Sequence, residues 1–122
     1  MNIEELGFLD EMPGEMRKEV LEYVRGERTE FSVVPELTGT EFQKAVLGAM
    51  MRIPRGEVRS YGEVALMAGY RKAARAVGSV CRGNKWPIII PCHRVVGSAG
   101  IGGYAFGVEM KRELLRQEGV IY

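Results

Sequence analysis

The sequence is poor in residues that build covalent or metal frameworks, because its 122 residues include only two cysteines and one histidine. That number is too small for a disulfide framework or a zinc cage of His and Cys ligands, so we expect no metal site. No apolar run approaches the roughly 20 residues of a membrane span. The acidic N-terminus has no basic stretch followed by a long apolar one. We therefore expect no signal peptide, no membrane partner and a cytoplasmic location, with nucleoid association if the source is prokaryotic.

Charge is what the sequence has in unequal measure along its length. The net charge is +1, but residues 1–50 carry five basic against eleven acidic side chains, and residues 51–122 carry twelve against five. A basic C-terminal half suits a surface that binds a polyanion such as DNA, since each neutralised phosphate releases counterions. The alternative is a chance asymmetry that disperses over the folded surface.

The chain length suits one compact domain, or one with a small appendage. Pro13-Gly14 predicts the start of a helix over about residues 15–24, and residues 30–34 are β-prone up to Pro35. Thr38-Gly39-Thr40 then marks a soft boundary. We predict a short N-terminal cap over residues 1–38 and the main domain over residues 39–122.

Two capping boxes predict the next helices. Thr40 with Gln43 opens a helix to about residue 52, and Ser60 with Glu63 opens a short one to about residue 67. Gly69 is the natural end of the second helix. A further helix over about residues 72–81 then completes a helix-turn-helix pattern, although any antiparallel helix pair gives the same pattern.

The second helix of this pair combines small residues with basic ones, namely Arg71, Lys72, Arg75 and Arg82. Small residues allow a close backbone approach to a partner and the basic ones supply charge there, which favours DNA binding. Beyond it, residues 86–91 predict a buried extended segment and residues 97–103 a mobile glycine-rich loop. A last helix is predicted over about residues 108–117, with Gly119 just past its end.

The only histidine, His93, directly follows Cys92. A thiolate is a nucleophile, and an imidazole that accepts its proton activates it. Adjacent side chains can cooperate only in a turn, which the preceding Pro91 favours. The structural alternative is a buried thiol beside an exposed imidazole. We interpret Cys81 as a small apolar helix residue.

The neighbourhood of this pair resembles the active-site motif of the O6-alkylguanine-DNA alkyltransferases, also called methylated-DNA–protein-cysteine methyltransferases. The motif here is Ile88-Ile89-Ile90-Pro91-Cys92-His93-Arg94-Val95-Val96. The resemblance covers about residues 39–119. Further matching segments follow in family order: Thr40–Gln43, Ile53–Val58, Ser60-Tyr61, Ala73–Gly78, Arg82–Asn84, Gly103-Tyr104 and Leu114–Gly119.

The resemblance implies an α/β, mainly helical fold: the family's C-terminal domain with a helix-turn-helix (winged-helix-like) and a reduced N-terminal α/β cap. It implies that Cys92 accepts the alkyl group, that His93 acts as base through an ordered water and that Glu118 orients the imidazole. Asn84 would brace the active-site turn and hydrogen-bond near the thiol. Tyr61 would donate a hydrogen bond to the departing guanine ring.

The resemblance also assigns the contacts with DNA. Arg75 would enter the base stack in place of the extruded nucleotide, and the helix would lie in the minor groove of double-stranded DNA. The other implied DNA-binding residues are Ser60, Tyr61, Lys72, Ala73, Ala74 and Arg82. The implied substrate-binding groups are Tyr61, the carbonyls of Cys92 and Val95, Tyr104 and the amide of Ala105. The implied reaction transfers the alkyl group once, irreversibly, in a monomer that needs no cofactor.

Three departures from the family pattern matter. Lys85 and Trp86 follow Asn84 where a proline is usual, and Phe106 stands where glycines are common, so we hypothesise that Phe106 narrows the pocket. The segment before Thr40 is shorter than the family's usual N-terminal domain and lacks the zinc ligands that some members carry there.

Other functions remain open. Alkyltransferase-like proteins bind O6-alkylguanine and recruit other repair factors, but they replace the acceptor cysteine, so Cys92 argues against that reading. A thiol hydrolase or protease built on Cys92-His93 would turn over through a labile thioester. A plain helix-turn-helix regulator would have no use for this dipeptide.

Overall fold

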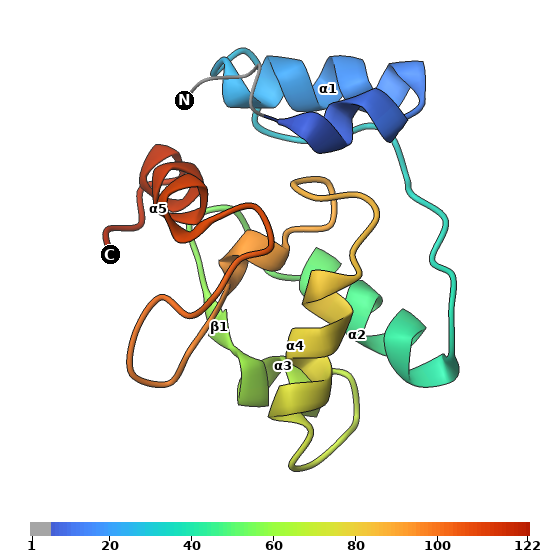
Figure 1. Ribbon diagram of the computed structural model, residues 1–122, viewed down its shortest axis with the longest axis vertical. Coiled ribbons are helices and arrows are strands. Elements are labelled where there is room, and N and C mark those ends of the chain that lie inside the picture. The colour runs from blue at the N-terminus through green and yellow to red at the C-terminus, as the bar shows by residue number, and fades with distance from the viewer. Residues whose placement is uncertain (1–5) are drawn as a thin grey trace.

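The computed structural model describes residues 6–122, and Figure 1 shows a mainly helical molecule. Its α-helices are α1 (Gly14–Val24), α2 (Glu41–Met51), α3 (Tyr61–Met67), α4 (Ala74–Arg82) and α5 (Val108–Gln117). Within residues 6–122 there are also the 3-10 helices η2 (Gly7–Glu11) and η3 (Cys92–Arg94) and the strands β1 (Arg59–Ser60) and β2 (Val95–Val96). The strands pair in parallel, so the predicted α/β, mainly helical class is confirmed.

The helix-turn-helix is formed by α3 and α4, which pack against each other and against α2. Their shared core is made of apolar side chains that the three helices and the active-site turn contribute: Val46, Ala49, Met50, Val64, Ala65, Val77, Val80, Ile90 and Val95. Cys92 is a buried member of the same cluster. The segment that carries Cys92 is therefore part of the core of the helix-turn-helix.

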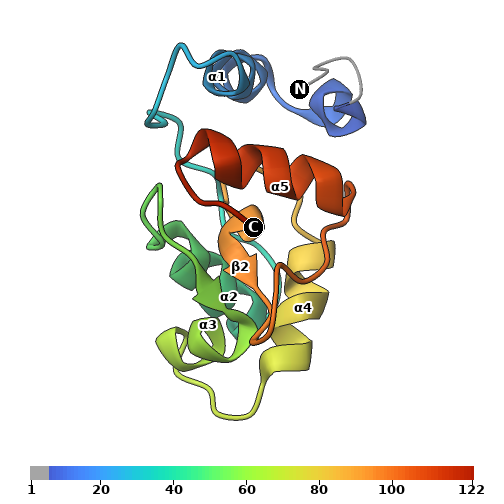
Figure 2. The same ribbon diagram turned by 90° about the vertical axis from the view of Figure 1, so that its left-hand side faces the viewer.

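A second core lies between the N-terminal segment and the rest of the molecule. Leu9, Val20 and Tyr23 pack there with Ile89 and Leu114, which come from the active-site loop and α5. Figure 2 shows α1 and η2 as a layer over α5, with α2, α3 and α4 on its other side. The N-terminal segment therefore shares its core with the rest of the chain.

Local capping signals give the helix boundaries. Thr40 and Ser60 each form the predicted capping box, with Gln43 and Glu63 as their partners. At the end of α3, Gly69 has φ +91° and donates its amide to the Leu66 carbonyl, a left-handed closure that glycine adopts without steric cost. The helices predicted over residues 15–24, 41–52 and 108–117 are confirmed to within a residue or two.

The start of the second helix of the pair is a correction. Helix α4 begins at Ala74, not at residue 72, because Lys72 has a left-handed backbone with φ +54°. Ala73 occupies the N-cap position and offers no capping side chain. Arg71 and Lys72 therefore lie in the turn between the helices, and only Arg75 and Arg82 of the predicted basic set lie on α4.

The β-prone segment at residues 30–34 was expected to form a strand of an α/β cap, and this expectation is wrong. Within residues 6–38 the structure has helices and irregular backbone but no strand. The buried Glu19 carboxylate accepts hydrogen bonds from the backbone amides of Ser32 and Val33, at 2.8 and 3.3 Å. A side chain of α1 thus replaces the missing strand partner.

The apolar run at residues 86–91 is a tight turn rather than an extended segment. Ile88 has φ +77°, and the Ile90 amide donates to the Trp86 carbonyl at 2.9 Å. Ile88, Ile89 and Ile90 are all buried, as expected. The turn delivers the chain directly into η3.

Candidate active site

Cys92 lies at the start of η3, at the wall of a cavity of about 700 Å³. Helix α4 supplies one side of this cavity through Ala74, Arg75, Gly78, Ser79, Cys81 and Arg82. The opposite side is made by Tyr61, Gly103, Tyr104 and Ala105. The small side chains of α4 thus leave room beside a buried thiol, and two arginines of the same helix border that space.

Asn84 holds the Cys92 thiol. Its Nδ2 donates to the Ile90 carbonyl at 2.9 Å and to Cys92 Sγ at 3.3 Å, while its Oδ1 accepts from the Trp86 amide at 3.0 Å. Burial raises the pKa of Cys92, and the Asn84 hydrogen bond and the charge of Lys111 only partly oppose this effect. The resting thiol is therefore protonated, and it needs a base to become a nucleophile.

His93 is fully buried and hydrogen-bonded to Glu118, with Nε2 2.8 Å from Oε2. Burial lowers the pKa of His93 despite the raising effect of Glu118, so the imidazole is neutral near pH 7. Because a carboxylate only accepts, Nε2 carries the single proton and donates it. Nδ1 is then an unprotonated nitrogen, buried without a hydrogen-bond partner among residues 6–122. It is available as a base.

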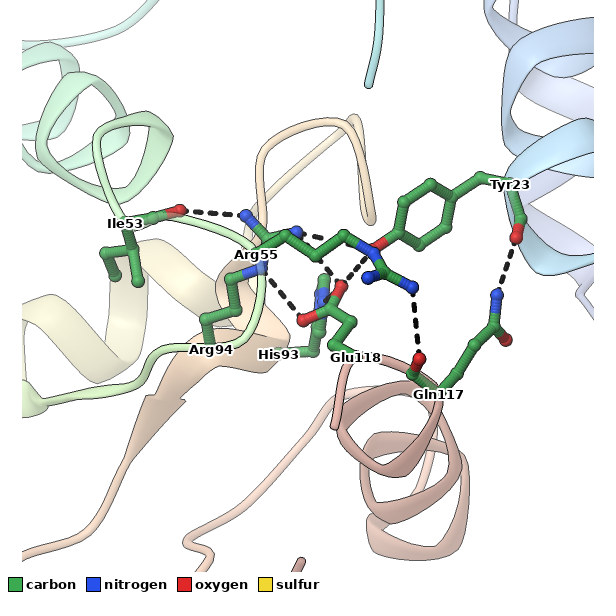
Figure 3. Close-up of polar contacts among 7 residues, drawn as sticks. All are labelled: Tyr23, Ile53, Arg55, His93, Arg94, Gln117 and Glu118. Atoms are coloured by element: carbon green, nitrogen blue, oxygen red, sulfur yellow. Dashed lines mark hydrogen bonds and ion pairs between the residues drawn. The ribbon is translucent and has the colours of Figure 1, made fainter. Parts of the chain in front are cut away.

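Glu118 anchors a buried polar cluster, which Figure 3 shows from the side of α5. Its carboxylate accepts from Arg94 Nε and Nη2 at 2.9 Å each and from the Tyr23 hydroxyl. Burial alone would raise the pKa of Glu118, but the hydrogen bonds from His93, Arg94 and Tyr23 hold it well below its ordinary value. Glu118 stays ionised, and Arg94 balances its charge.

Glu118 is placed by the end of α5. It is the C-cap residue, and Gly119, with φ +89°, closes the helix by donating to the Arg116 carbonyl. Arg94 also donates from Nη1 to the Ile53 carbonyl at 2.8 Å. The structure thus brings together four of the residues predicted to be catalytic: Asn84 contacts Cys92, and His93 contacts Glu118. Cys92 and His93 lie in a turn, as their predicted cooperation requires.

The pocket side chains Tyr61 and Tyr104 lie on the same cavity. The Tyr61 hydroxyl is 3.4 Å from the Gly103 carbonyl, and a Cβ on Gly102 would come 3.1 Å from that hydroxyl. Gly102, with φ +74°, therefore lets the glycine-rich loop approach Tyr61 closely. The Tyr104 hydroxyl is buried and has no hydrogen-bond partner in the described chain.

Some residues that were expected to contact DNA or guanine do not line the cavity or already make other hydrogen bonds. The Ser60 hydroxyl caps α3 by accepting from the Glu63 amide at 3.1 Å. The Val95 carbonyl, expected to read the guanine amine, already accepts from Lys111 Nζ at 2.6 Å, which leaves it one lone pair. Ser60, Lys72, Ala73 and Val95 are not among the residues that line the cavity.

The three departures have clear positions. Lys85 is exposed, and Trp86 packs against both core clusters. The Phe106 ring lies tilted against Phe8, with ring centroids 4.7 Å apart, and edge-on to Tyr104, with centroids 5.4 Å apart. Phe106 is not among the cavity-lining residues, so the hypothesis that it narrows the pocket directly is wrong. Phe106 therefore lies between Phe8 of η2 and Tyr104, and it contacts both rings.

Sequence reasoning missed three residues at this site: Tyr23, Arg94 and Lys111. Lys111 is fully buried, its Nζ donates to the carbonyls of Val95 and Gly103, and burial lowers its pKa to about 8. One signal was available, because Lys111 shares a helical face with Leu114 and Leu115, where a charged residue is unexpected. Tyr23 and Arg94 gave no such signal, since their roles depend on a partner distant in sequence.

Two further features of the described residues bear on the class of protein. In the part of the chain that the structure describes, no three His, Cys, Asp or Glu side chains cluster so as to hold a metal ion. No helix over residues 6–122 is long and apolar enough to cross a membrane. What the fold and the site define is a helix-turn-helix protein with a buried thiol, Cys92, in the wall of a cavity beside α4.

Comparison with known proteins identifies the family. The domain described as "6-O-methylguanine DNA methyltransferase, DNA binding domain" matches residues 41–120, about two-thirds of the chain. The chain belongs to this family.

Relatives with curated names agree. The methylated-DNA–protein-cysteine methyltransferase of Mycobacterium tuberculosis is 50% identical over 97 residues, which cover 79% of this chain and 59% of that protein. The protein of the same name from Methanosarcina acetivorans is 46% identical over 106 residues, 86% of this chain and 68% of the relative. The chain thus matches about three-fifths of the length of the mycobacterial relative.

Solved structures share the fold. The OGT of Mycobacterium tuberculosis in complex with DNA superposes with a TM-score of 0.81 at 45% identity, over 87% of this chain and 65% of that one. The O6-methylguanine-DNA methyltransferase of Pyrococcus kodakaraensis gives a TM-score of 0.74 at 33% identity, over 96% and 76%. S. pombe Atl1, in complex with DNA containing O6-carboxymethylguanine, gives 0.60 at 33%, over 67% and 79%.

Proposed function

We propose that this protein repairs O6-alkylguanine, chiefly O6-methylguanine, in double-stranded DNA by moving the alkyl group onto Cys92. The observation that carries the proposal is the buried Cys92 thiol, in a cavity beside α4, next to a neutral imidazole with a free Nδ1. Membership of the family and its similarity to a relative solved with DNA support DNA as the partner. The proposal extends to a monomer, in the cytoplasm or at a nucleoid.

The first step activates the thiol. The Cys92 S–H proton passes through a bridging water to His93 Nδ1, and the imidazolium that forms is stabilised by the ionised Glu118 at Nε2. Asn84 Nδ2, 3.3 Å from Sγ, donates to the thiolate, and the buried positive charge of Lys111 favours it. These groups offset the cost of forming a buried anion.

The second step is a single in-line displacement. Thiolate sulfur forms a bond to the alkyl carbon while the carbon–oxygen bond to guanine O6 breaks, and guanine leaves with the electron pair. Tyr61 donates a hydrogen bond to the departing ring, so the leaving group need not be a free anion. Tyr104, the Ala105 amide and the Cys92 carbonyl would hold the base. The Val95 carbonyl would join them through the lone pair that Lys111 leaves free.

Access requires base flipping, because guanine O6 in a duplex is out of reach of a buried thiol. Helix α4 would enter the minor groove, where Ala74 and Gly78 permit close approach and Arg75 fills the gap left in the stack. Ser60, Lys72, Ala73 and Arg82 would contact the backbone nearby. The product is a thioether, which is a poor leaving group, so each molecule reacts once.

The test measures whether guanine is restored in the DNA. A duplex with one O6-methylguanine is incubated with excess protein, and its nucleosides are then analysed. We expect guanine to be restored by the unaltered protein and by Cys81→Ala, the matched control in the same cavity, but not by Cys92→Ala. Restoration by Cys92→Ala overturns the proposal. Tight binding without restoration by the unaltered protein indicates the alternative, a lesion-binding protein that recruits other factors.

A further inference from the structure

Tyr23 connects the N-terminal segment to the buried polar cluster. It lies in the last turn of α1 and is fully buried. Its hydroxyl donates to Glu118 Oε2, the same oxygen that accepts from His93 Nε2. Figure 3 shows the phenol reaching this carboxylate from α1, whereas His93 reaches it from η3. Tyr23, which lies 95 positions before Glu118 in the sequence, thus shares an acceptor atom with the proposed base, His93.

The phenol is held in place from several directions. Gln117 Nε2 donates to the Tyr23 carbonyl at 2.6 Å, and the Tyr23 ring stacks on Phe31 with centroids 5.1 Å apart. The Arg55 guanidinium lies 5.9 Å from the ring centroid and donates to the Gln117 carbonyl at 3.0 Å. These contacts fix the Tyr23 ring so that its hydroxyl points at one carboxylate oxygen, Glu118 Oε2. Packing of the ring alone would not require that orientation.

The shared oxygen gives Tyr23 an electrical effect on His93. Burial and the hydrogen bond to Glu118 raise the pKa of Tyr23, so the hydroxyl keeps its proton and donates. The charged and titratable groups that face His93 are Glu118, Arg94 and Lys111, with Tyr23 reaching it through Glu118. Each donor to Oε2 withdraws negative charge, which weakens the pull of Glu118 on an additional imidazole proton.

We propose that Tyr23 is a positioning residue for His93: acting through Glu118, it orients the carboxylate and keeps the imidazole neutral with Nδ1 free. Helix α1 is then a working part of the alkyl-transfer site. This inference rests on the proposed function for its purpose, but the coupling itself is measurable without any reaction.

The test uses the fact that His93 is the only histidine of the chain. Histidine labelled with ¹⁵N gives one pair of ring signals, which report the tautomer and the titration of His93 directly. Tyr23→Phe keeps the ring, its stack on Phe31 and the contact with Arg55. It removes only the hydroxyl, which donates to Glu118 and accepts from Arg94 Nη2 at 3.3 Å. Phe31→Leu is the matched control, because it disturbs the packing of Tyr23 without removing a bond to Glu118.

We expect the unaltered protein to show a neutral Nε2–H imidazole at pH 7. Tyr23→Phe should raise the pKa of His93 by about one unit, since removing one donor strengthens the pull of the carboxylate on the proton. Phe31→Leu should leave that pKa unchanged while lowering the melting temperature. Coincident titrations of Tyr23→Phe and the unaltered protein, or an equal shift in Phe31→Leu, overturn the inference.

A second variant and a rate measurement complete the design. If Tyr23→Phe does not fold, Tyr23→Met removes the same hydroxyl and leaves an apolar side chain in its place, and a raised His93 pKa supports the inference while an unchanged one overturns it. In single-turnover alkyl transfer, the acid limb of the rate profile should move to higher pH by the same shift in Tyr23→Phe. A shifted titration without any alkyl transfer by the unaltered protein contradicts the proposed function alone.

Discussion

Glu118 is the residue on which the buried cluster depends most. It accepts from His93, Arg94 and Tyr23, which come from the active-site turn and from α1. Its charge is matched by Arg94, so the cluster is neutral overall when His93 is neutral. Removing one partner of such a buried pair typically costs about 3–5 kcal/mol, because the other charge is left uncompensated.

We predict that Glu118→Gln both destabilises the protein and slows alkyl transfer. The unfolding free energy should fall by about 3–5 kcal/mol, and the loss of a properly stabilised imidazolium should reduce the rate by roughly 100-fold. Urea denaturation and single-turnover kinetics measure the two effects. Glu109→Gln, an exposed carboxylate on the same helix, is the control and should change both little. A rate equal to that of the unaltered protein would contradict the assigned role.

Helix α4 lines the thiol cavity and is also the helix that we propose to bind DNA. Gly78 and Ala74 line the cavity, and Arg75 lies at its exposed border. None of the hydrogen bonds that hold Cys92, His93 or Glu118 comes from Arg75. In the proposed function, Arg75 therefore helps to flip the alkylated guanine and takes no part in the transfer of the alkyl group.

We predict that Arg75→Ala slows transfer from duplex DNA by about tenfold or more, because the extruded nucleotide loses its replacement in the stack. Transfer from the free base O6-benzylguanine should stay within about twofold, because that substrate needs no flipping. Arg116→Ala, at an exposed arginine of α5, changes the charge equally and is the control. Equal slowing with both substrates would place Arg75 in the chemistry instead.

Element boundaries show what could be predicted from sequence. The capping boxes at Thr40 and Ser60 are local, so the helices that they open were predicted correctly. The strand expected at residues 30–34 failed because strand pairing is decided by a distant partner, here the Glu19 carboxylate. The start of α4 failed because the left-handed backbone of Lys72 leaves no mark in composition.

For the molecule as a whole, the N-terminal segment is tied to the site at two places. Phe8 contacts Phe106 behind Tyr104, and Tyr23 contacts Glu118. Neither contact was predictable, since each joins segments far apart in the chain. By contrast, the turn at Cys92 and His93 was predicted from the adjacent Pro91, because proline favours a turn directly before them. Their proposed roles came from the resemblance to the family and not from their adjacency.

We predict that the whole molecule loses stability as pH falls below about 6.5. Burial lowers the pKa of His93, so the unfolded chain takes up a proton there that the folded chain does not. Glu118 acts in the same direction below its ordinary value of 4.5, because its folded pKa is also lowered. Urea midpoints measured at several pH values between 8 and 4 test this. A flat profile from about pH 7 to pH 5 would mean that His93 is not buried in its neutral form.

The most direct test of the account is the mass of the peptides after reaction with an excess of DNA that contains O6-methylguanine. We predict a gain of ~14 Da, one methyl group, on the peptide with Cys92, reaching a plateau at one per chain, with Cys81 unmodified. A methyl group on Cys81, demethylation that continues beyond one equivalent, or an unmodified Cys92 in a tightly bound complex would contradict it.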